Sequence, residues 1–141
     1  MTRVNQLIST TMGLEERRKI KEIQDTILPE RTAELKEITG ADIAYDIDWD
    51  SFANDKEGLN FLDNLSCHRI NMALRTICID DLGKEAVRDT LKTIKLHNVH
   101  SKEAMAIQFG EGVLEMSLNY AQGTNGYYSD IEIKNVLMAG M

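Results

Sequence analysis

One apolar segment, residues 59–79, constrains the fold of this chain more than any other feature. Twelve of its 21 residues are apolar, and at 100° per residue they cover most of the circumference of a helix. A helix that is apolar nearly all round is usually buried. We therefore expect one central, largely buried helix over about 55–79, with Asn54 or Asp55 as its N-cap.

Hydrophobic periodicity predicts the other elements. Apolar residues at helical spacing predict helices over 14–28, 30–39, about 84–93 and from 129 onward. Strict alternation predicts strands over 42–50, 93–99, 105–109 and 114–120. Pro29 should kink or interrupt the first helical pattern. The predicted order is α-α-β-α-α-β-β-β-α, and its three consecutive strands favour an α+β fold with an antiparallel sheet of about four strands packed with helices.

The length of 141 residues is typical of one domain. We expect a flexible N-terminal segment over 1–13 and a single globular domain over 14–141. No run of 18 apolar residues is present, and the first residues have no apolar stretch of signal-peptide type. The two cysteines make no secreted disulfide framework. The expected location is therefore the cytoplasm.

Negative charge is concentrated in one short segment. The net charge is −7, and residues 41–63 carry seven carboxylates against one lysine. This balance disfavours nucleic acid and anionic membrane surfaces as partners. An acidic surface instead steers the approach of a basic protein. The side chains that we expect to contact such a partner are Asp46, Asp48, Asp50 and Asp55.

The same segment resembles a calcium-binding EF-hand loop over twelve residues, from Asp46 to Glu57. Ser51 occupies the position at which the sharp turn of that loop requires glycine. The residues before it alternate between apolar and polar, which predicts a strand rather than the entering helix of an EF-hand. Strand geometry would hold the aspartates in line, whereas calcium needs converging ligands. His97 and His100 do not bring four convergent ligands for zinc either. We expect no metal site and no cofactor.

A polar stripe interrupts the apolar surface of the central helix. It consists of Asn60, Asn64, His68, Asn71 and Arg75, with Cys67 and Cys78 in the same sector. Asparagine costs helix stability relative to Glu, Lys or Gln, so solvation alone does not explain the stripe. Either these side chains bond neighbouring loops as a buried seam, or they line a ligand site with His68 as acid–base group and Arg75 as anion binder.

No catalytic signature accompanies these features. The chain lacks the glycine-rich, Walker, HExxH and GxSxG motifs, and Cys67 and His68 point about 100° apart as helix neighbours. We assign no catalytic residue and expect a non-enzymatic binding module of the immunity, inhibitor, chaperone or adaptor type, acting through the acidic 41–63 surface. The alternatives are a small-molecule binder or enzyme with a pocket over the Asn60–Arg75 stripe, and a homo-oligomer joined through the apolar end that carries Met138 and Met141.

Overall fold

The computed structural model describes residues 12–141. The helices are α2 (Leu14–Glu22), α3 (Leu28–Thr39), α4 (Lys56–Leu62), α5 (His68–Ile77), α6 (Asp81–Thr90) and α7 (Asp130–Ala139). The strands are β1 (Ala44–Ile47), β2 (Thr93–Asn98), β3 (Ala106–Gly110) and β4 (Val113–Leu118). The α+β class is confirmed. The segment 1–13 lies outside the described residues except for its end, where Met12 is buried.

The four strands form one open sheet in the order β1-β2-β4-β3. β1 pairs with β2 and β2 with β4 in parallel, and only β3 runs antiparallel to β4. The prediction of an antiparallel sheet is therefore wrong, because the sheet is mixed. A long connection through α4, α5 and α6 returns the chain to the same end of the sheet, and such a crossover gives parallel pairing. The hairpin β3–β4 then folds back, so that β4 enters between β2 and β3.

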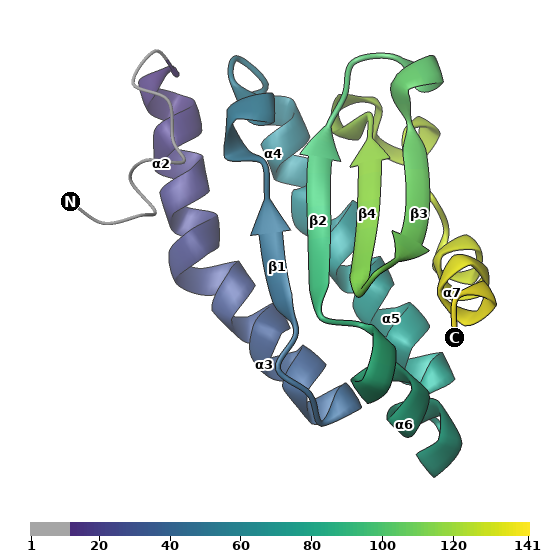
Figure 1. Cartoon of the computed structure of the whole chain (residues 1–141). Helices are drawn as coiled ribbons and strands as arrows, with labels where there is room; N and C mark the ends of the chain where they lie inside the picture. Colours follow the sequence, from purple (N-terminus) through teal and green to yellow (C-terminus); the bar gives the residue numbers. More distant parts are fainter. Residues whose placement is uncertain (1–11) are drawn as a thin grey trace.

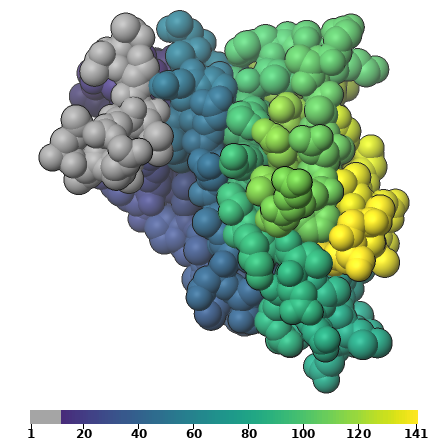
Figure 2. Space-filling view, viewed as in Figure 1, coloured from purple at the N-terminus to yellow at the C-terminus, as the bar shows by residue number. Residues whose placement is uncertain are grey.

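The helices cover one face of the sheet. α4 and α5 lie behind the strands in Figure 1, and α7 packs on α5 beside β3. Figure 2 shows the opposite face, where no described helix lies in front of β2, β4 and β3. The core lies between the sheet and the helices, where Ile94, Leu114, Ile70 and Leu74 are fully buried. Burying such a side chain stabilises the fold by about 1.5–3 kcal/mol.

The predicted central helix is divided, and it is buried on one side only. A π-helical turn, Asp63–Cys67, separates α4 from α5, and α5 ends at Ile77. Met72 remains 38% exposed. The apolar residues therefore cover more of the helix circumference than the part that faces the core. A second π-helical turn, Ile23–Ile27, precedes Pro29. The helical run continues through this proline, which has no N–H to donate, because the π turn has already shifted the hydrogen-bond register.

The strand predicted over 42–50 is shorter than expected. β1 ends at Ile47, and Trp49–Phe52 forms a 3₁₀ turn. Alternation persists through this change, because Ile47 and Trp49 are each 4% exposed whereas Asp46, Asp48 and Asp50 are exposed. Trp49 therefore points into the core. The acidic side chains therefore stand outside a segment whose other side is anchored in the core.

Candidate functional site

The acidic segment does not behave as one uniform surface. Four aspartates are exposed: Asp42 precedes β1, Asp46 lies on it, and Asp48 and Asp50 follow it. Asp55, the fourth residue of the expected contact set, is 8% exposed and caps α4, because its Oδ1 accepts the backbone N–H of Gly58 at 2.9 Å. Its Oδ2 accepts from the side-chain amide of Asn98 on β2 at 2.7 Å. Both oxygens of Asp55 are thus used inside the fold.

The carboxylates of the acidic segment lie beside a second polar group that sequence reasoning did not connect with them. We call the sheet surface turned away from the helices the open face. Cross-strand register aligns four of its side chains in one row: Asp46, Lys95, Glu115 and Gln108. Paired residues of neighbouring strands point to the same side of a sheet. The acidic segment therefore continues across the open face as a row of three charged side chains, negative, positive and negative, that ends in the neutral Gln108.

His97 links this row to the acidic turn. Its Nδ1 lies 3.3 Å from Asp48 Oδ2, and its Nε2 lies 2.8 Å from Glu115 Oε2. Only the doubly protonated imidazole donates to both carboxylates. The hydrogen bond from His97, together with one from Gln108, holds the pKa of Glu115 below its usual value. The ring thus lies within hydrogen-bond distance of two carboxylates on the exposed surface.

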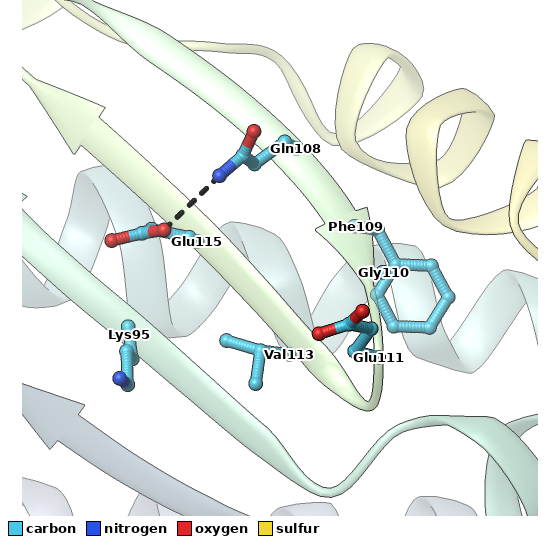
Figure 3. A pocket seen from close by; sticks show the side chains of 7 residues that line it. All are labelled: Lys95, Gln108, Phe109, Gly110, Glu111, Val113 and Glu115. Carbon is cyan, nitrogen blue, oxygen red and sulfur yellow. Dashed lines mark hydrogen bonds between the residues drawn. The ribbon is translucent and has the colours of Figure 1, made fainter.

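A shallow groove marks the hairpin end of the open face. Its volume is about 390 Å³, and it is lined by Lys95, Gln108, Phe109, Gly110, Glu111, Val113 and Glu115. Figure 3 shows Gln108 bonded to Glu115 across β3 and β4, with Lys95 on the neighbouring strand β2. Two carboxylates and one ammonium group therefore surround this groove. Such a surface suits polar contacts with a protein better than an enclosed small-molecule pocket.

The polar stripe of the central helix separates into exposed and buried members. Asn60, Asn64 and Arg75 are exposed, His68 is partly buried, and Asn71 is 1% exposed. The Asn71 amide donates to Glu34 Oε1 at 2.6 Å and to the Arg31 carbonyl at 3.2 Å. Its Oδ1 accepts from the Tyr45 hydroxyl at 2.7 Å. Asn71 thus joins α5 to α3 and β1.

Ion pairs extend this junction along α3. Arg31 binds both carboxylate oxygens of Asp63 at 2.7 and 2.9 Å, and Glu34 contacts Arg31 and Arg75 at 3.2 Å each. The Asp63 carboxylate raises the pKa of Arg31 above its ordinary value. The hydrogen bond from Asn71 and the charge of Arg31 hold the pKa of Glu34 below its ordinary value. These contacts hold α3 against the Asp63–Cys67 turn and α5.

The lowered pKa of Glu34 predicts a pH dependence of stability. A depressed folded-state pKa adds stability above the ordinary value of 4.5, and this stability is lost as pH falls through the folded value. Urea denaturation between about pH 6 and pH 3 should show this loss. Glu34→Gln should flatten the decline, whereas Glu37→Gln, on an exposed position of the same helix, should not. Equal slopes in the two variants would contradict this assignment.

Neither cysteine is placed for nucleophilic chemistry. Cys67 and Cys78 are both buried and free. Burial raises the pKa of the Cys67 thiol to about 12 and also raises that of Cys78. A thiol with a raised pKa is a poor nucleophile because the thiolate is the reactive form.

The aspartates at 46, 48 and 50 do not converge on a common point. In the part of the chain from Met12 onward, no three His, Cys, Asp or Glu side chains form a group that could hold a metal ion. Asp46 belongs to β1, Asp50 to the 3₁₀ turn and Glu57 to α4, so the EF-hand-like sequence spans three different conformations. None of the described helices is both long and apolar enough to cross a bilayer.

Comparison with known proteins identifies no relative. No family model matches the chain, and no curated protein or solved structure shows significant similarity to it. The functional interpretation therefore depends on the site alone.

Proposed function

We propose that the protein is a small binding module that receives a basic protein partner on β1, the Trp49–Phe52 turn and the adjoining open face. The observation that carries this proposal is the row of exposed aspartates at 46, 48 and 50, which alternate with the buried Ile47 and Trp49. Carboxylates on a rigid backbone lose little conformational freedom when a partner binds. Their field also accelerates the encounter with a positively charged surface.

The contacts of Asp48 refine this proposal. Because His97 joins Asp48 to Glu115, the surface offered to the partner includes the centre of the sheet as well as its acidic edge. Asp46 and Asp50 flank this contact on either side and are exposed. Asp55 is better explained as a helix cap, so we place the partner surface on Asp46, Asp48 and Asp50 together with Glu115.

The alternative of a small-molecule site over the Asn60–Arg75 stripe receives less support. Asn71 lies at the centre of the stripe. Its side-chain amide already donates to Arg31 and Glu34, and its carbonyl oxygen already accepts from Tyr45. A ligand site needs polar groups that converge on a cavity and remain free to bind. The contacts of Asn71 instead support the buried-seam interpretation, and no catalytic role is proposed for His68.

Charge-neutralising variants test the proposed partner surface. Asp46→Asn with Asp50→Asn removes two charges from it, and Glu85→Gln with Asp89→Asn removes two from exposed positions of α6. Each immobilised full-length variant is exposed to lysate of the native host at about 0.05 M salt, where surface charges are weakly screened. We expect the first variant to lose a basic protein that the wild type and the α6 variant retain.

The same variants should differ in rate when that basic protein is purified. We expect Asp46→Asn with Asp50→Asn to slow association roughly three- to tenfold at low salt, and the difference to shrink at about 0.5 M salt. The free energy of unfolding should change by less than about 0.5 kcal/mol, because both side chains are on the surface. Equal retention of every partner by the two variants would refute the proposed surface.

A further inference from the structure

An apolar groove opens at the end of the molecule that carries the C-terminus. It has a volume of about 490 Å³ and lies between the end of α5, the start of α6 and the last turns of α7. Its lining residues are Thr76, Ile77, Ile79, Asp80, Leu82, Gly83, Ala86, Lys134, Met138 and Met141. The groove is separate from the acidic surface, because β1 contributes no residue to it.

Several of the large hydrophobic side chains that line this groove are exposed to solvent. Ile79 is 84% exposed, Leu82 79% and Met138 55%. Single exposed hydrophobic residues are ordinary on protein surfaces, but several that gather at one groove indicate an interaction site. Leu14, another exposed hydrophobic residue, lies at the start of α2 and does not line the groove.

The turn that carries Ile79 and Leu82 is held in a defined conformation. Asp80 caps α6 by accepting the backbone N–H of Gly83 at 2.8 Å. A side chain at position 83 would collide with the carbonyl of Ile77, so glycine allows α6 to approach the end of α5 closely. The two projecting side chains are therefore presented on a fixed backbone, which lowers the entropic cost of docking.

The two walls of the groove carry side chains of opposite charge, Asp80 on one and Lys134 on the other. The α5–α6 wall carries the projecting Ile79 and Leu82 with Asp80, whereas the α7 wall carries Met138 and Met141 with Lys134. We propose that the occupant is a second copy of this chain, related by a two-fold axis. That symmetry sets the α5–α6 turn of each copy against α7 of the other, and every contact is made twice.

In this arrangement the apolar side chains of one wall cover those of the opposite wall, and Asp80 of each copy faces Lys134 of the other. An apolar centre with a polar rim is the usual anatomy of a protein interface. The acidic residues of β1 remain uncovered. This inference is independent of the proposed binding of a basic partner, so each can fail without the other.

Self-association of the full-length protein tests this inference. Sedimentation and light scattering over a concentration series should show a particle of twice the 16.0 kDa chain mass. Leu82→Glu should raise the dissociation constant at least about tenfold, because it places two carboxylates in the apolar contact. Leu14→Glu makes the same chemical change on α2 and should leave association unchanged. Both leucines lie in the first turn of a helix, where glutamate is well tolerated.

Lys134 tests the orientation of the two copies. Lys134→Glu should weaken the dimer, whereas Lys134→Arg should preserve it, because only the first places like charges opposite Asp80. Thermal melts of all variants establish that they are folded. A chain that stays monomeric up to about 1 mM, or a dimer that survives Leu82→Glu, overturns the inference. A dimer that is lost in Leu82→Glu but indifferent to Lys134→Glu overturns the two-fold pairing.

Discussion

Replacing Asn71 by leucine should lower the free energy of unfolding by about 2–3 kcal/mol. The side chain is buried, and it donates to Glu34 and to the carbonyl of Arg31 while it accepts from Tyr45. Leucine fills a similar volume but leaves three buried or partly buried polar groups without this partner. The cost of leaving such groups unpaired exceeds the gain from burying an apolar side chain at a site that is already closed.

Asn64→Leu is the matched control for this prediction. The substitution is chemically the same and lies two helical turns away in the same stripe, but Asn64 is exposed. Its effect should stay within about 0.5 kcal/mol. Urea denaturation of both variants gives the comparison. If Asn71→Leu were neutral or stabilising, the junction between α5, α3 and β1 would not contribute to folding, and an open ligand site over the stripe would regain support.

Local sequence patterns predicted the elements of this protein better than their arrangement. Alternation placed the side chains of the 42–50 segment on the correct sides, and the helix predicted from 129 onward is α7, which begins with a capping box of Ser129 and Glu132. Gly40 ends α3 in the left-handed conformation that the C-terminal position requires. Each of these features is determined by residues within a few positions of one another.

The arrangement of the strands depends on distant residues, and here prediction failed. Three consecutive strands suggested antiparallel neighbours, yet β2 is joined by β1 and β4, both in parallel. The sequence of a single strand contains no information on which strand will lie beside it. Only the length of the connection from β1 to β2, which holds three helices, favoured a crossover.

The candidate site shows the same limit. His97 meets Asp48 and Glu115 across separations of 49 and 18 residues, and Asn71 meets Glu34 across 37. Spacing along one helix identified Asn71 as an unusual residue, but it could not name the partners. The strand predicted over 93–99 contains His97, but the contacts of this side chain on the open face became visible only when the register of three strands was known.

Asp55 is the residue whose role the fold changes most, and Asp55→Ala should cost about 2–4 kcal/mol of folding stability. The carboxylate caps α4 through Gly58, which is worth about 1 kcal/mol. It also accepts from Asn98, whose amide is buried and would lose one of its two acceptors. An unpaired buried donor costs about 1–3 kcal/mol more. The melting temperature should fall by about 10 °C.

Two further variants separate this structural role from a role in binding. Asp46→Ala should leave the melting temperature within a few degrees of the wild type, because its side chain is exposed on β1. Asp55→Asn keeps an acceptor for the helix cap but cannot accept from both Gly58 and Asn98, so its loss should be intermediate. At a temperature where all variants are folded, Asp55→Ala should associate with a basic partner nearly as fast as the wild type, whereas Asp46→Ala should be slower at low salt. If Asp55→Ala were instead as stable as the wild type but slow to bind, Asp55 would contact the partner and its cap would not contribute to folding.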